Sequence, residues 1–175
     1  MKNIISVLAL SCALAGPASG LESNRTKLAT YGQWSYYKVL SVTTGKSRYE
    51  AVAQGYSPDR QSGLTLRCET IGSRYITPVI KFDRYMGNGF RIFHYTFNTN
   101  LNGISHVQTG LHYLTGLQFT NGGDLDRFLD MLPNSQSLTV GAITYGGQPV
   151  TIKADIRGAD KALARITSDC KGNMI

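Results

Sequence analysis

The sequence is poor in charged residues and lacks long apolar runs, and each shortage excludes a class of protein. Charged side chains make up 17% of the 175 residues and hydrophobic ones 42%. The chain is therefore not wholly disordered, because disordered chains combine many charges with few apolar residues. No apolar run approaches the roughly 20 residues of a membrane-spanning helix, which excludes a multi-span membrane protein. The length fits one domain of common size.

The N-terminus has the three parts of a secretory signal. Met1 and Lys2 form a short positive start, residues 4–14 are mostly apolar, and residues 15–20 are small or helix-breaking. The segment Ala18-Ser19-Gly20 fits the small-x-small cleavage pattern. We therefore expect residues 1–20 to be removed near Gly20 and the mature chain to be exported.

Cys12 raises the alternative of a lipoprotein with an acylated N-terminal cysteine. The residues before it are Ala9, Leu10 and Ser11, whereas a lipoprotein signal usually has a small residue at the position of Leu10. The apolar stretch before Cys12 is also short. We expect soluble export, with no transmembrane segment after signal cleavage.

Cysteine is scarce, with three residues in the chain. Removal of the signal leaves Cys68 and Cys170, an even number without C-x-x-C spacing, in an oxidising compartment. This pattern favours one structural disulfide, Cys68–Cys170, over a catalytic thiol or a redox pair. Closing a loop of about a hundred residues would stabilise the fold by roughly 4–5 kcal/mol in the chain-entropy account.

The mature chain is basic, but its charge is scattered. Without Lys2 it carries 17 Lys and Arg against 11 Asp and Glu. No block of five or six like charges occurs, so the sequence does not indicate a nucleic-acid-binding arm. A diffuse positive field favours encounters with anionic envelope polymers or acidic proteins, which are the partners we expect.

The fold class expected from the sequence is mainly β (α+β), an antiparallel β-sandwich-like single domain with two short helices near the C-terminus. Residues 21–33 are polar, and we expect them to form a loose N-terminal segment. We expect residues 34–172 to form a single β-rich domain. Alternating apolar and polar residues between turn-forming clusters predict the strands. The expected strands are 36–42, 49–53, 64–68, 75–82, 90–97, 137–144 and 150–156.

Turn and helix signals connect these strands. The Met86–Gly89 turn predicts a hairpin between strands 75–82 and 90–97, and Pro78 suggests an edge or a bulge. Residues 124–132 show helical spacing and end at Pro133. A second helix opens at Ala159, with an apolar stripe that includes Cys170. Two core-facing cysteines on separate elements are credible bridge partners.

Signatures of catalysis and metal binding are missing. The three histidines show no H-x-x-x-H spacing, and neither a G-x-S-x-G nor an S-x-x-K box occurs. The carboxylates form no recognisable catalytic pair. We therefore expect no catalytic residues, no cofactor and no metal site, and a protein that is not an enzyme.

A binding surface is predicted around the Gly- and Asn-rich residues 98–123. This segment promises little core burial and carries His106 and His112. Arg91, Phe93 and Tyr95 alternate along the preceding strand and so share one face. If that face is open, they would form a positively charged aromatic patch together with His106 and His112. The alternative is a connection lying over a buried strand face.

Several short motifs resemble small periplasmic two-cysteine proteins of the type VI secretion-associated VasI/TagO type. The resemblance covers about residues 34–170, matches poorly over 90–123 and departs from the family at residues 154–156. A weaker resemblance links the chain to the invasion-associated locus B family. The resembling motifs are Trp34, LTLRC at 64–68, IKFD at 80–83, FLDML at 128–132, SLTV at 137–140, VTIKADIRG at 150–158 and ALARI at 162–166 before Cys170.

This resemblance implies an accessory envelope protein without established catalysis. Together with the export signal, it favours a periplasmic binding protein that is associated with a secretion system or the cell envelope. An inhibitor or immunity protein against an envelope-directed enzyme is one alternative. An envelope hydrolase that depends on His94, His106 or His112 is the other. The sequence does not indicate an oligomeric state.

Overall fold

The computed structural model describes residues 24–41, 44–55, 62–68, 76–87, 89–98, 102–109, 116–119 and 122–171, with side chains except at 89–91 and 102–118. These residues form ten strands in one antiparallel sheet of order β1-β2-β3-β4-β5-β8-β7-β6-β9-β10. The strands are β1 (Asn24–Tyr31), β2 (Trp34–Leu40), β3 (Ser47–Gln54), β4 (Gly63–Cys68), β5 (Thr77–Lys81), β6 (Gly89–Phe97), β7 (Asn102–Thr109), β8 (Gly116–Phe119), β9 (Ser137–Ile143) and β10 (Pro149–Asp155).

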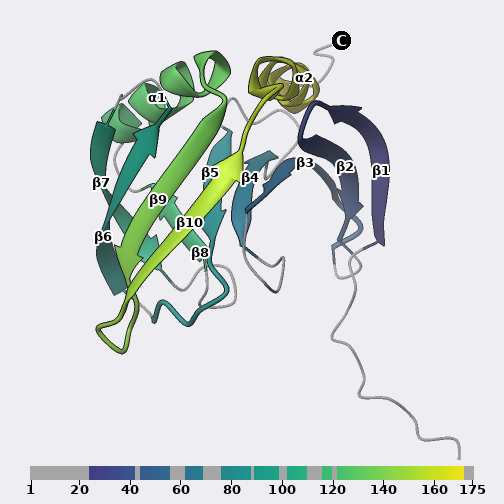
Figure 1. Cartoon of the computed structure of the whole chain (residues 1–175). Helices are drawn as coiled ribbons and strands as arrows, with labels where there is room; N and C mark the ends of the chain where they lie inside the picture. Colours follow the sequence, from purple (N-terminus) through teal and green to yellow (C-terminus); the bar gives the residue numbers. More distant parts are fainter. Residues whose placement is uncertain are drawn as a thin grey trace, which may run out of the picture.

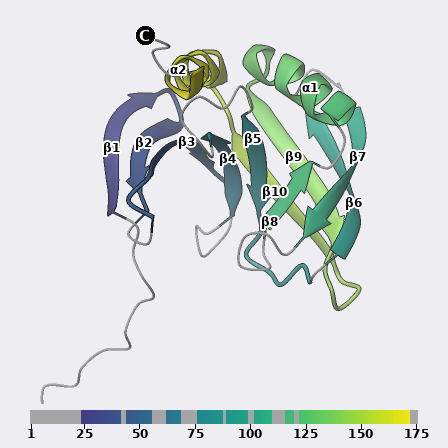
Figure 2. The same ribbon diagram turned by 180° about the vertical axis from the view of Figure 1, so that it is seen from behind.

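The sheet folds over, so that its two halves face each other across one core. Gly55, which directly follows β3, forms an antiparallel bridge with Ala154 of β10. This bridge brings β10, the last strand in the sheet order, beside β3. Figures 1 and 2 show the two halves, β1–β4 on one side and β6, β7, β9 and β10 on the other. Both halves contribute to a single cluster of buried hydrophobic residues. The predicted sandwich-like, mainly antiparallel single domain is confirmed.

Period-two alternation along the strands supplies this core. On β4, Leu64, Leu66 and Cys68 are fully buried, whereas the intervening residues are partly exposed. On β9, Leu138 and Val140 point into the core in the same way. Successive side chains of a strand point to opposite faces of the sheet, so the apolar set of each strand selects the inner face.

Two helices close the same end of the folded sheet. They are α1 (Gly122–Met131), followed by the 3-10 turn η1 (Leu132–Asn134), and α2 (Ala159–Lys171). The fully buried ring of Phe128 anchors α1 in the core. The buried residues of α2 are Ala159, Ala162, Ile166 and Cys170, the stripe that the sequence predicts.

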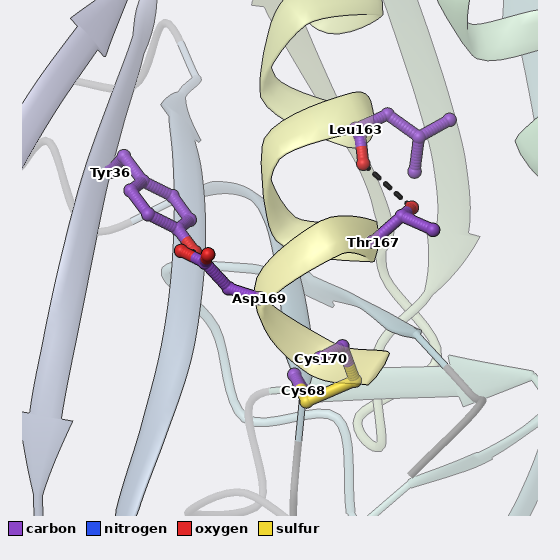
Figure 3. The surroundings of a disulfide bond; sticks show 6 residues. All are labelled: Tyr36, Cys68, Leu163, Thr167, Asp169 and Cys170. Carbon is purple, nitrogen blue, oxygen red and sulfur yellow. Dashed lines mark hydrogen bonds between the residues drawn. A yellow bond between two sulfur atoms is a disulfide. The ribbon is translucent and has the colours of Figure 1, made fainter. Parts of the chain in front are cut away.

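The predicted disulfide is confirmed. Cys68 at the end of β4 is bonded to Cys170 near the end of α2, across a sequence separation of 102 (Figure 3). Beside it, the hydroxyl of Tyr36 donates a 2.7 Å hydrogen bond to Oδ2 of Asp169. Burial and the Asp169 carboxylate raise the pKa of Tyr36 far above its usual range. The helix is thus tied to the sheet by one covalent and one polar contact.

A second tie joins the β1–β2 turn to the start of α2. Trp34 is fully buried, and its Nε1 donates to the carbonyl oxygen of Ile156 at 2.9 Å. Gly32 and Gly158 have positive φ angles of 58° and 90°. A Cβ on Gly158 would lie 2.4 Å from the carbonyl oxygen of Tyr31, so this crossing requires glycine.

The predicted hairpin between strands 75–82 and 90–97 is wrong. β6 pairs with β7 and β9, whereas β5 pairs with β4 and β8. The cause lies in residues 98–123, which supply β7 and β8. These two strands run back from β6 to β5, and β8 occupies the edge of β5 that a hairpin with β6 would need. β7 and β8 therefore belong to the centre of the sheet, so this part of the segment is not a dispensable connection.

The N-terminal boundary also differs from the prediction. Residues 24–31, expected to be loose, form β1, whose first five residues are exposed. β1 pairs with β2 along its length, with a bulge between Lys27 and Ala29. Its polar sequence suits an edge strand because little of it is buried. The predicted signal at residues 1–20 lies outside the described residues.

Candidate functional site

The structure corrects the predicted binding surface on β6. Phe93 and Tyr95 are 0% and 2% exposed, with their ring centroids 5.7 Å apart. They share the core face of β6 with Phe97, while Ile92 and His94 occupy the exposed face. Burial of three aromatic rings outweighs any benefit of exposing them, because each large side chain contributes a few kcal/mol when it leaves water.

The other predicted surface residues are not tested. The side chains of Arg91 and His106 and all of His112 lie outside the described residues, so their part in binding stays a prediction. Backbone pairing places His106 opposite Ile92. In the described part of the chain, no three His, Cys, Asp or Glu side chains come together as metal ligands. No described helix is long and apolar enough to span a membrane.

A concentration of charge lies on the outer face of β1–β4. Strand pairing places Arg25 opposite Val39 and Val39 opposite Arg48, and it places Glu50 opposite Arg67. Residues paired in this way share one face of an antiparallel sheet. Arg25 of β1, Arg48 and Glu50 of β3, and Arg67 of β4 therefore meet in one group, called here the arginine cluster.

Glu50 is the centre of the arginine cluster. Its Oε1 accepts hydrogen bonds from Nε of Arg48 at 3.0 Å and Nε of Arg67 at 3.1 Å. Its Oε2 accepts one from Nη2 of Arg25 at 3.0 Å. Glu50 is only 5% exposed. A buried carboxylate requires such partners, because the loss of hydration must be compensated.

Part of the positive charge of the cluster is exposed to solvent. The side chains of Arg25 and Arg48 are 40% and 32% exposed, whereas that of Arg67 is 12% exposed. The guanidinium carbon of Arg25 lies 3.9 Å from the ring centroid of Tyr37. Stacking and ion pairing hold these groups in place, which suits recognition of an anion.

An open depression of about 510 Å³ lies at the ends of β1–β3, on the sheet face opposite to the cluster. Its lining residues are Asn24, Arg25, Thr26, Lys38, Leu40 and Ser47. Apart from Arg25, they alternate along their strands with the positions that carry the cluster, so their side chains point to the other face. The depression is therefore separate from the arginine cluster.

Sequence reasoning missed this site because its residues are far apart in the chain. Arg25, Arg48 and Arg67 stand in three strands and look like scattered charges. Their meeting depends on the pairing register of β1–β4, which no local motif encodes. The alternation Arg48-x-Glu50 within one predicted strand was the available signal, since it places opposite charges on one face.

A second depression, of about 500 Å³, crosses β9 and β10, and several of its polar groups bond to one another. Nη2 of Arg157 lies 2.6 Å from Oδ2 of Asp155, and this hydrogen-bonded partner lowers the pKa of Asp155. Oδ1 of Asn98 accepts backbone N–H groups of Gln136 and Ser137 at 2.7 and 3.2 Å. These contacts of Asn98, Asp155 and Arg157 stabilise this end of β9 and β10.

Fold and surface together define a small single-domain β protein with a Cys68–Cys170 disulfide and a group of charged side chains on the outer face of β1–β4. The fold is similar to the crystal structure of invasion associated protein B from Bartonella henselae, with a TM-score of 0.54 and 10% sequence identity. The alignment covers 80% of this chain and 95% of that one.

The likeness to this crystal structure concerns the fold alone. The name of that protein corresponds to the invasion-associated locus B family, the weaker of the two family resemblances in the sequence. No family model matches the chain, and no curated protein matches it. The resemblance to the VasI/TagO type therefore has no support from these matches.

Proposed function

We propose that this chain is an exported accessory protein of the bacterial cell envelope, which binds an anionic envelope component without catalysing a reaction. The arginine cluster carries the proposal. It presents the partly exposed guanidinium groups of Arg25 and Arg48 at the surface, and guanidinium groups bind anions but do not deprotonate in proteins. Such a group of side chains is suited to holding a ligand rather than to proton transfer.

Two further observations support the periplasmic location. The sequence begins with the pattern of a cleavable export signal. The Cys68–Cys170 disulfide requires an oxidising compartment to form and persist. The likeness to an invasion-associated protein agrees with an envelope role at the level of fold.

Cell fractionation and envelope binding test the proposal. The tagged full chain should appear in periplasmic extract with its first 20 residues removed, as measured by mass spectrometry. It should sediment with isolated envelopes at low salt and be released near 1 M salt, where the screening length falls to about 3 Å. Arg25→Gln combined with Arg48→Gln should reduce sedimentation.

Arg127→Gln combined with Lys161→Gln is the matched control, since it removes the same charge from exposed positions on α1 and α2. This control should sediment as the unchanged protein does. Equal loss in both double variants would mean that net charge alone drives binding, and the assigned surface would be wrong. Capture of one acidic enzyme, with inhibition of that enzyme, would favour the inhibitor alternative instead.

The finer proposal places this envelope role in a type VI secretion system. It rests on the sequence motifs that resemble the VasI/TagO type. Deletion of the chain's gene should then reduce secretion by that system, and the arginine-cluster variants should share the defect. Normal secretion in the deletion strain would refute the link to a type VI secretion system, but it would not contradict the proposed envelope binding.

A further inference from the structure

Exposed hydrophobic side chains gather around the hairpin that joins β9 to β10. Tyr85, Ile92, Ile143 and Tyr145 are 50%, 51%, 51% and 65% exposed. They are four of the six large hydrophobic residues that are exposed in the described part of the chain. The ring centroids of Tyr85 and Tyr145 lie 5.5 Å apart, in an edge-on contact. These four residues are called here the hairpin patch.

The two isoleucines extend the hairpin patch onto the outer face of the sheet. Phe93 of β6 pairs with Ala142 of β9, so the next positions of the two strands, Ile92 and Ile143, lie beside each other. Because Phe93 and Ala142 are buried, their neighbours Ile92 and Ile143 point outward. Tyr145 follows Ile143 by two residues. The patch is therefore continuous from the sheet to the hairpin.

Hydrogen bonds hold the hairpin patch in place. The N–H of Thr144 donates to the carbonyl oxygen of Gln148 at 2.8 Å, and that of Gly147 donates to the carbonyl oxygen of Thr144 at 3.0 Å. The N–H of Tyr145 donates to the carbonyl oxygen of Tyr85 at 3.3 Å. Figures 1 and 2 show the hairpin extending past the neighbouring strands, at the end of the sheet remote from the helices. The two exposed rings are thus presented on an ordered projection.

We propose that the hairpin patch docks the protein on the surface of an anionic phospholipid bilayer. This inference goes beyond the proposed function, because strands other than those of the arginine cluster make the contact. Exposed apolar patches mark sites of interaction with proteins or membranes. Tyrosine combines an apolar ring with a polar hydroxyl, which suits the boundary between acyl chains and head groups. The two isoleucines beside the rings would enter the apolar layer.

The charge beside the hairpin patch favours an anionic bilayer. Arg84 directly precedes Tyr85 and is 70% exposed, while its neighbour Asp83 is 19% exposed. Lys81, at the start of the same connection, is exposed as well. Basic residues near a membrane surface are attracted to anionic lipids. The contact needs this attraction, since even a whole acyl chain by itself anchors a protein only marginally.

Vesicle flotation tests the docking. The protein purified from periplasmic extract should float at low salt with vesicles of phosphatidylethanolamine and phosphatidylglycerol, and at least several-fold less with phosphatidylcholine vesicles. Ile143→Thr combined with Tyr145→Ser should weaken binding about fivefold or more, because apolar surface is removed from the contact. The matched control is Leu28→Thr combined with Leu40→Thr, since these side chains are 47% and 39% exposed on β1 and β2. This control should bind normally. Equal loss in both double variants, or no binding by the unchanged protein, overturns the proposal.

A fluorescent variant tests the contact without removing the aromatic ring. Trp34 is fully buried, so its emission should not respond to lipid. The emission of Tyr145→Trp should move to shorter wavelength with anionic vesicles, and lipids brominated on their acyl chains should quench it. Leu40→Trp should show neither change. Unquenched emission from vesicle-bound Tyr145→Trp protein would refute the assignment. Dimerisation or capture of one protein that depends on Ile143 and Tyr145, without vesicle binding, would assign the patch to a protein contact and overturn the proposal.

The proposed function and this inference fail separately. Vesicle binding that is lost in Arg25→Gln combined with Arg48→Gln, but kept in Ile143→Thr combined with Tyr145→Ser, would retain the former and overturn the latter. Envelope sedimentation that ignores Arg25 and Arg48, together with quenching of Tyr145→Trp by brominated lipid, would overturn the former and retain the latter.

Discussion

Glu50→Gln is the sharpest test of how the arginine cluster is built. The amide would keep one oxygen in place of Oε1, where Arg48 and Arg67 donate. It would put an NH₂ group where Oε2 accepts from Arg25, so two donors would face each other. The three guanidinium groups would also lose the carboxylate that they share. We expect Glu50→Gln to destabilise the fold.

The magnitude follows from exposure. Removing one partner from a fully buried ion pair costs about 3–5 kcal/mol. Arg25 and Arg48 are partly exposed, so water will compensate part of their loss, and exposed pairs contribute about 0–1 kcal/mol. The contact with Arg67 is the least screened. We therefore expect a decrease of about 2–3 kcal/mol in the free energy of unfolding.

Urea unfolding at pH 7 measures this change. The control is Arg84→Gln, because Arg84 is 70% exposed and lies 3.8 Å from Asp83; it should change the stability by less than about 0.5 kcal/mol. Adding 0.5 M salt should alter the Glu50→Gln effect only in part, since buried pairs are poorly screened. A Glu50→Gln protein as stable as the unchanged one would refute the description of Glu50 as the organising group.

Three other predictions concern the fold. Replacing Cys68 and Cys170 with serine should lower the free energy of unfolding by about 4–5 kcal/mol, because the disulfide closes a loop of about 100 residues. Urea titrations measure this loss, and a loss below about 1 kcal/mol would contradict the prediction. Gly158→Ala should cost at least 2 kcal/mol more than Gly147→Ala, since both have positive φ but Gly147 has open space around it; equal effects on thermal unfolding would show that the close approach is unimportant. The raised pKa of Tyr36 stabilises the fold below pH 10, and this stability is lost as pH rises above 10. Tyr36→Phe should therefore flatten the decline between pH 10 and 12, and an unchanged slope would argue against the buried hydroxyl.

Local patterns were enough to predict most of the strands and both helices. The alternation at 64–68, the β9–β10 hairpin and the apolar stripe of α2 each involve residues close together in the chain. The disulfide followed from two core-facing cysteines in an exported chain. The edge or bulge expected at Pro78 is not found, because β5 lies between β4 and β8 and its pairing with β4 is regular. Pro78 pairs with Leu66 of β4, while the ladder to β8 begins at Val79, so its missing N–H falls outside that ladder.

Strand order and exposure required information that the local patterns do not contain. Residues 98–123 look like a loop because glycine and asparagine disfavour strands, yet β7 and β8 gain partners on both sides. Alternation on β6 showed that Phe93 and Tyr95 share a face, but not which face meets the core. The arginine cluster is a product of register across strands, and register is set by the packing of the whole sheet.

The two faces of β4 link the disulfide to the binding surface. Cys68 points inward to Cys170, and the neighbouring Arg67 points outward to Glu50. A slip of one residue in the β3–β4 pairing would turn Arg67 into the core and Cys68 out to solvent. The disulfide excludes that slip, because Cys68 must stay within bonding distance of α2. The bond that holds α2 on the sheet therefore also fixes the position of a guanidinium group in the arginine cluster.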